Sequence, residues 1–140
     1  RYAFLIEDEK DLAKRYSAKN FNLKQIPMPR VDSLNMATVA VFEYLIGNTD
    51  WSVPFLHNIK LLTKKGYGYP IPVPYDFDHS GIVEAKYARP PEQLELSSTR
   101  ERLYRGLTYS PEILHQVFEK FRVVIFSKRL HQQRLNNLLE

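Results

Sequence analysis

Two short apolar runs joined by a glycine-containing turn constrain the middle of this chain more than any other feature. Asn58–Thr63 and Tyr69–Tyr75 each have the length and composition of a strand, and residues 64–68, with two glycines, fit the turn between them. Pro72 and Pro74 lack backbone donors, so the second run can pair only on one side. The sequence therefore predicts a hairpin whose second strand lies at a sheet edge.

Helices are predicted on both sides of this hairpin. Asp32 or Ser33 can cap a helix that is apolar nearly all round and stops at Gly47, which indicates a buried, central helix. Ser110-Pro111 is a strong start for a long helix. The remaining predicted elements are a strand over Tyr2–Ile6, helices over Glu9–Tyr16 and Thr99–Tyr104, and an end of the last helix near Leu139. Whether that last helix breaks near Ser127 stays open. The predicted fold class is α+β, mainly helical, with a small β-hairpin.

The length of the chain predicts one domain. Its 140 residues can bury one sizeable core, so residues 1–140 are expected to form a single domain. The chain begins at Arg1 and enters a strand-like run directly, so we expect it to be a piece of a longer protein. The sequence contains no cysteine, which excludes disulfides and thiolate chemistry. It also has no apolar run of about 20 residues, so no membrane span is expected in this segment.

The charge of the chain is modest and mixed. A net charge of +4 arises from 20 basic and 16 acidic residues that are interspersed along the sequence. Nucleic-acid binders usually gather lysine and arginine on one face. We therefore expect no nucleic-acid partner.

Four oxygen-bearing side chains lie at one end of the predicted hairpin or on the loop before it. Asn58 begins the first strand and Asp76 ends the second, so antiparallel pairing would make them neighbours. Asp50 lies on the loop just before Asn58, and Asp78 is a rival to Asp76. Phosphoryl transfer needs a carboxylate to orient and deprotonate the acceptor, and oxygen ligands for Mg²⁺. Asp50 is thus a candidate base, and Asn58, Asp76 and Asp78 are candidate metal ligands.

The two stretches that carry these residues resemble atypical protein-kinase-like families, most closely the CotH-type kinases. The matching residues are Asp50, Asn58-Ile59-Lys60-Leu61-Leu62 and Val73-Pro74-Tyr75-Asp76-Phe77-Asp78. The resemblance implies a kinase-like C-terminal catalytic lobe that uses ATP and Mg²⁺ to phosphorylate a protein or small-molecule acceptor. The glycine-rich loop and strand lysine of such enzymes would lie upstream of Arg1. Asp50 and Asn58 are eight positions apart, farther than in typical protein kinases.

Other interpretations of the same residues stay open. Asp50 and Asp76 could simply belong to Asx-rich turns of a non-catalytic binding or structural module on a kinase-like scaffold. The same carboxylates could also serve a metal-dependent hydrolase. His57 is expected to point away from Asn58, as strand neighbours do, whereas His79 could contact metal or phosphate. The arginines near position 102 are expected to bind acidic residues within the fold or an acidic substrate; they are Arg100, Arg102 and Arg105.

Overall fold

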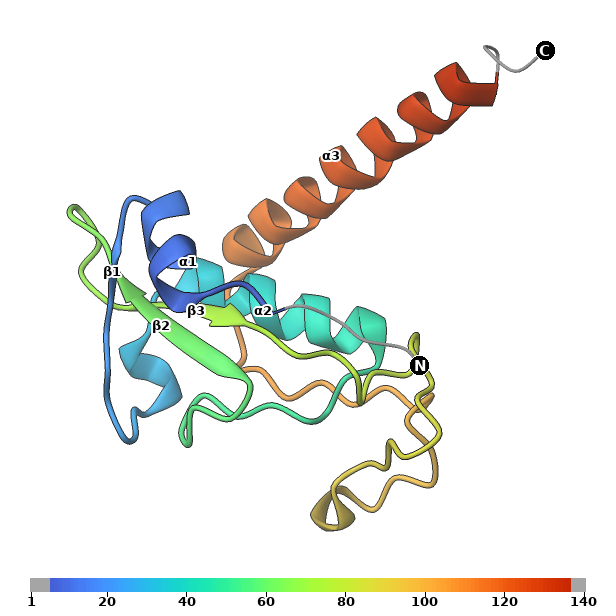
Figure 1. Ribbon diagram of the computed structural model, residues 1–140, viewed down its shortest axis with the longest axis horizontal. Coiled ribbons are helices and arrows are strands. Elements are labelled where there is room, and N and C mark those ends of the chain that lie inside the picture. Colours follow the sequence, from blue (N-terminus) through green and yellow to red (C-terminus); the bar gives the residue numbers. More distant parts are fainter. Residues whose placement is uncertain (1–5, 137–140) are drawn as a thin grey trace. The chain divides into compact units, whose positions relative to one another are not determined.

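The computed structural model describes residues 6–136, and the side chains of residues 6–124. The chain divides into two compact units, one up to residue 107 and one from residue 108 onward. The first unit contains a three-stranded antiparallel sheet in the order β1-β2-β3, two α-helices and two short 3-10 helices (Figure 1). Its elements are α1 (Glu9–Arg15), β1 (Lys19–Asn20), η1 (Met28–Arg30), α2 (Ser33–Ile46), β2 (Ile59–Thr63), β3 (Ile71–Pro74) and η2 (Glu92–Leu94).

The second unit is built on α3 (Pro111–Asn136), one continuous helix. Ser110 begins it as predicted, since its hydroxyl accepts a hydrogen bond from the Ile113 backbone N–H at 3.4 Å. The predicted helix end near Leu139 lies outside the described residues, as do residues 2–5 of the predicted first strand. Among the described residues, no helix is both long enough and apolar enough to cross a membrane.

The α+β class is confirmed, and the boundaries of α2 follow from its two ends. The Asp32 carboxylate accepts a hydrogen bond from the Asn35 backbone N–H at 3.0 Å and caps the first turn. Gly47 ends the helix in the left-handed conformation, with φ of +67°. Between these ends the helix buries seven side chains, which are Met36, Ala37, Val39, Ala40, Val41, Glu43 and Ile46. The helix is therefore central to the first unit, as its composition predicts.

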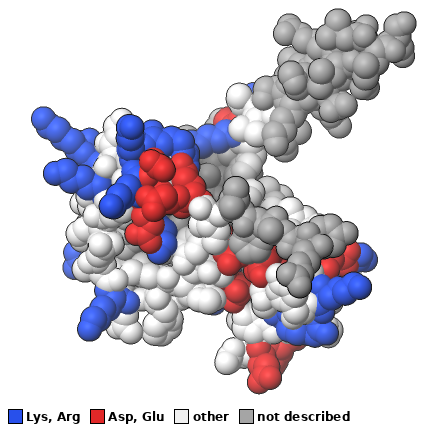
Figure 2. All heavy atoms as spheres, in the orientation of Figure 1, with Lys and Arg blue, Asp and Glu red and all other residues white. Residues whose placement is uncertain are grey.

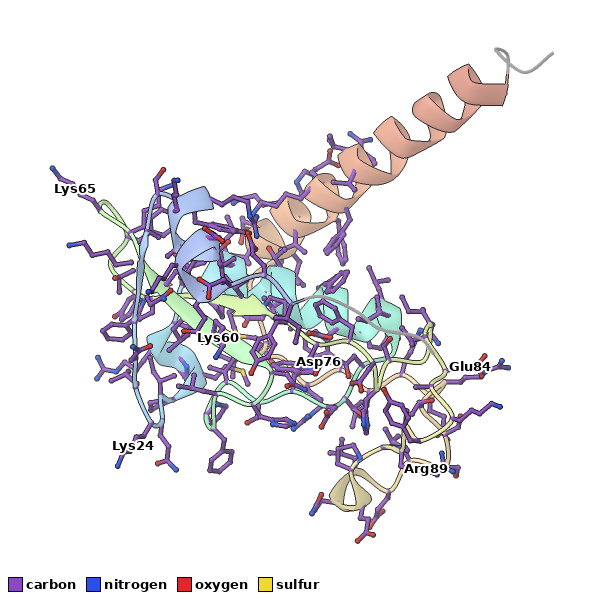
Figure 3. All side chains as sticks on the ribbon, in the orientation of Figure 1. Lys24, Lys60, Lys65, Asp76, Glu84 and Arg89 are labelled. Carbon is purple, nitrogen blue, oxygen red and sulfur yellow. The ribbon has the colours of Figure 1, made fainter. Side chains whose placement is uncertain are left out.

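The hairpin is also confirmed, with antiparallel pairing of β2 and β3. Ile59 pairs with Pro74 and Leu62 with Ile71. Because β3 is an edge strand, its two prolines, which have no backbone N–H, interrupt no pairing with a further strand. Leu62 and Ile71 pack with Leu12 and Ala13 of α1 in one buried cluster. In Figure 3, Lys65 marks the turn of the hairpin and Asp76 lies beyond its opposite end.

The predicted helix over Thr99–Tyr104 is wrong. Residues 98–101 form a turn, and no helix is present between residues 95 and 110. The backbone N–H of Arg100 donates to the Ser98 hydroxyl at 3.1 Å, and the Glu101 carboxylate accepts from the Ser97 and Ser98 N–H groups. These local bonds satisfy the backbone without a helical ladder, which is a common outcome for serine-rich segments.

Acidic and basic side chains are interleaved on the face shown in Figure 2. Acidic residues gather over α1, with lysine and arginine around them. Specific contacts account for part of this mixture, including the ion pair between Lys60 and Glu9 and the pair between Arg15 and Glu7. On the described part of this face, basic and acidic side chains therefore lie next to one another.

Gly47→Ala is expected to destabilise the protein more than Gly66→Ala. Both glycines have positive φ, +67° and +92°, so alanine costs about 1–2 kcal/mol of backbone strain at either position. At Gly47 an added Cβ would also lie 3.1 Å from the Thr99 backbone oxygen, whereas at Gly66 it would meet nothing within 4 Å. Urea unfolding of both variants measures the difference. Equal losses of stability would show that the α2 end is not tightly packed.

Candidate functional site

Asp50 is the centre of the candidate site, and both of its carboxylate oxygens have a partner. The His57 Nε2 lies 3.0 Å from Asp50 Oδ1, and the Asn58 amide nitrogen donates to Oδ2 at 3.1 Å. The same Asn58 nitrogen also donates to the Asp50 backbone oxygen at 2.8 Å. Three contacts from two successive residues therefore hold the aspartate in one orientation.

The loop that carries Asp50 is fixed at its start by Asn48. The Asn48 side-chain oxygen accepts a hydrogen bond from the Asp50 backbone N–H at 3.0 Å, and the Asn48 N–H donates to the Glu43 backbone oxygen at 2.9 Å. This is an Asx turn built directly on the last turn of α2. The end of the buried helix α2 thus fixes the position of the candidate base, Asp50.

Arg105 holds the same loop from a distant part of the sequence. Its guanidinium donates to the backbone oxygens of Thr49 and Trp51, and it lies 5.6 Å from the centre of the Trp51 ring. Burial lowers the pKa of Arg105, and the nearby Asp50 carboxylate opposes that change. The guanidinium therefore binds the backbone on both sides of Asp50.

The two other arginines of this region have different roles. Arg100 forms an ion pair with Glu84, as the sequence predicts for one member of the group. Arg102 donates to the backbone oxygens of Leu45 and Arg100. Two of the three arginines thus bind backbone carbonyls and not acidic side chains.

The hairpin brings Asn58 and the segment of Asp76 to the same end of the sheet. The Tyr75 backbone N–H donates to the Asn58 backbone oxygen at 3.0 Å, so Asp76 follows directly after the last paired residue. Asn58 and Asp76 both have left-handed backbones, with φ of +53° and +59°. Asparagine and aspartate tolerate this conformation better than other non-glycine residues. Such conformations gather at functional sites in other proteins.

Asp76 is affected by both Asp78 and Asp50, and the carboxyls of Asp76 and Asp78 are not equivalent. Burial, the neighbouring Asp78 and the charge of Asp50 raise the pKa of Asp76. For Asp78, burial is the largest single influence and acts in the same direction, but the hydrogen bond from the Tyr87 hydroxyl at 2.7 Å, together with Asp76 and His79, outweighs it and lowers the pKa. One Asp78 oxygen is therefore occupied by Tyr87, which favours Asp76 as the metal ligand.

The side chains of Asn58 and Asp76 carry oxygen donors of the kind that Mg²⁺ prefers. In the part of the chain that the structure describes, no three histidine or acidic side chains are grouped so as to hold a metal ion by themselves. Mg²⁺ is commonly bound by one or two protein ligands together with substrate phosphates and water. The Asn58 nitrogen is engaged with Asp50, so its Oδ1 is the atom that remains for a metal. Asn58 Oδ1 and an Asp76 oxygen are hard ligands of the right kind.

Two hollows flank these residues. One has a volume of about 620 Å³ and is lined by α1, Lys60, the end of β3 and residues 75–78. The other, of about 460 Å³, is lined by residues 49–52 and 55–57 with Pro91 and Arg105. Asp76 and Asp78 border the first hollow, and Asp50 and His57 border the second.

The expected direction of His57 is wrong. The strand begins at Ile59, and the positive φ of Leu56 and Asn58 interrupts the alternation that would separate the side chains of residues 57 and 58. The expected contact of His79 with metal or phosphate stays a prediction. In the structure, the His79 Nδ1 lies 3.3 Å from the Arg89 backbone oxygen, and the ring packs against Tyr87. The role of Arg105 has no local sequence signal, because its partners are more than fifty residues away.

No protein-family model, curated protein or solved structure matches this chain. The chemistry of the site must therefore be argued from its own residues.

The Glu43 carboxyl makes the free energy of unfolding depend on pH. Burial raises the pKa of this α2 carboxyl from 4.5 to about 7, partly opposed by Asn48, and its Oε2 has no hydrogen-bond partner among the described residues. Between pH 4.5 and about 7 the folded chain keeps a proton that the unfolded chain has released, so stability falls as pH rises. The loss across this window is about 3 kcal/mol.

Glu43→Gln should flatten this part of the stability profile, because the amide does not titrate. Urea unfolding at pH values from 4 to 8 measures the slope. Glu92→Gln, at an exposed position in η2, is the matched control and should keep the wild-type slope. An unchanged slope in Glu43→Gln would contradict the assignment.

Proposed function

We propose that this chain is the catalytic lobe of a kinase-like phosphotransferase that uses ATP and Mg²⁺, most similar in plan to the CotH-type kinases. The observation that carries the proposal is the arrangement of Asn58. Its amide nitrogen is bound to Asp50, and its backbone is paired with the strand that leads into Asp76. Asn58, a candidate metal ligand, therefore binds the candidate base Asp50 directly. The hairpin brings the segment of the second candidate ligand, Asp76, to the same end.

In this proposal Asp50 orients the acceptor hydroxyl and takes its proton as the acceptor oxygen bonds to the γ-phosphorus. The bond from that phosphorus to the ADP oxygen breaks in the same displacement. Asn58 and Asp76 would hold Mg²⁺, which neutralises charge on the phosphates. Catalysis then rests on positioning and electrostatics, and the chain's own contribution is the fixed orientation of Asp50.

The larger hollow is the place that suits the nucleotide. Its volume of about 620 Å³ is within the range of small-molecule sites, and it combines apolar residues such as Leu12 and Val73 with Asp76 at its border. The adenine ring of ATP needs an apolar surface, and its triphosphate needs a metal ligand close by. The smaller hollow, beside Asp50, is left for the acceptor.

Asp50→Asn should lower kcat by about 10²–10⁴-fold and leave the affinity for Mg²⁺-ATP within about twofold of wild type. A base acts in the transition state, so its loss spares ground-state binding. ADP release and nucleotide calorimetry on the full-length protein measure the two quantities. Asp11→Asn, at an exposed position on α1, is the control. Near-normal turnover of Asp50→Asn would show that Asp50 is not the base.

Asp76→Asn should weaken Mg²⁺-dependent nucleotide binding about tenfold or more, because it removes a charged ligand. Asp78→Asn should weaken it less, since Tyr87 already binds one Asp78 oxygen. Nucleotide affinity measured over a range of Mg²⁺ concentrations compares the two variants. A larger effect at Asp78 would exchange the two roles.

A further inference from the structure

The eight-residue separation between Asp50 and Asn58 is folded into a closed loop. The Ser52 N–H donates to the His57 backbone oxygen and the His57 N–H donates to the Ser52 backbone oxygen, both at 2.9 Å. Within the loop, Leu56 donates to the Val53 backbone oxygen and adopts a φ of +53°. The additional residues therefore return the chain to its starting point and place His57 next to Asp50.

His57 and Asn58 hold opposite oxygens of the same carboxylate. The imidazole Nε2 lies 3.0 Å from Oδ1, and the amide nitrogen lies 3.1 Å from Oδ2. An ionised carboxylate only accepts hydrogen bonds, so the imidazole nitrogen at this contact must carry the hydrogen. Two donors on different oxygens fix the plane of the carboxylate, which a single donor would leave free to rotate.

The exposure of the pair argues against a purely structural role. The His57 side chain is 56% exposed and that of Asp50 is 26% exposed. Hydrogen-bonded pairs at such exposure contribute little to folding stability. The contact is thus expected to fix the orientation of the Asp50 carboxylate and to add little to the stability of the fold.

We propose that His57 is a positioning residue for Asp50. It donates its Nε2 hydrogen to Oδ1 and, together with Asn58, directs the remaining lone pairs of the carboxylate toward the acceptor hydroxyl in the smaller hollow. This inference rests on the proposed function, in which Asp50 takes the acceptor proton. Small displacements of a catalytic group can lower rates about 10²-fold, so an unrestrained carboxylate would be a much poorer base.

Two substitutions at His57 separate positioning from chemistry. His57→Ala removes the donor and should lower kcat about 10- to 100-fold, with the nucleotide KM within about twofold of wild type. His57→Gln keeps an N–H group that can reach Asp50 and should restore kcat to within about fivefold of wild type. His115→Ala, at an exposed position on α3, is the control and should match wild type. All three variants should keep the wild-type urea midpoint.

The outcomes are distinct. Wild-type kcat in His57→Ala would overturn the inference and leave the proposed function intact. Equal losses in His57→Ala and His57→Gln would also overturn it, because the imidazole would then act by its own proton transfer. Absence of phosphoryl transfer in the wild type would overturn both the proposed function and the role of His57.

A measurement independent of turnover tests the contact itself. Nitrogen-15 correlation spectra of the wild-type imidazoles identify which ring nitrogen carries the hydrogen in each neutral histidine. The inference requires the Nε2–H tautomer at His57, with its assignment made by loss of the signal in His57→Gln. The Nδ1–H tautomer would overturn the inference.

Discussion

The antiparallel pairing of β2 with β3 is the constraint on which the candidate site depends. Because Ile59 is opposite Pro74, the residues that precede β2 and follow β3 emerge at the same end of the hairpin. The bond from the Tyr75 N–H to the Asn58 oxygen extends that pairing by one step. A shift of the register by one residue would turn these side chains to the other face of the sheet and separate Asn58 from the segment of Asp76.

The loop that carries Asp50 is held by structure on both sides of it. Before it, Gly47 ends the central helix and Asn48 begins an Asx turn. After it, the Ser52–His57 backbone pair closes a short loop, and Arg105 binds the carbonyls on either side of Asp50. Burial of the Glu43 carboxyl in the preceding helix costs stability as the pH rises from 4.5 to about 7. Such a cost is common where polar groups are gathered near a site.

Much of the framework could be predicted because its signals are local. The cap at Asp32, the left-handed glycine at position 47 and the two prolines of β3 each act within a few residues, and all appear as expected. The segment from Thr99 was misassigned because the side-chain bonds of Ser98 and Glu101 compete with a helix there. Periodicity gives no measure of that competition.

The site could be predicted only in outline. Order along the chain indicated that Asp50, Asn58 and Asp76 belong together, since a hairpin is a short-range element. The partnership of His57 with Asp50 depends on positive φ at Leu56 and Asn58, which residue type alone does not specify. The contact of Arg105 with the loop depends on tertiary packing across more than fifty residues. The hydrogen bond from Tyr87 to one Asp78 oxygen could not be predicted from the sequence.

The most direct test is a crystal structure of the full-length protein with Mg²⁺ and a non-hydrolysable ATP analogue. The account predicts Mg²⁺ within about 2.1 Å of Asn58 Oδ1 and an Asp76 oxygen, with the Asn58 nitrogen still bound to Asp50 and the terminal phosphate facing Asp50. A nucleotide bound away from the end of the β2–β3 hairpin, or Mg²⁺ bound without Asn58 and Asp76, would contradict it.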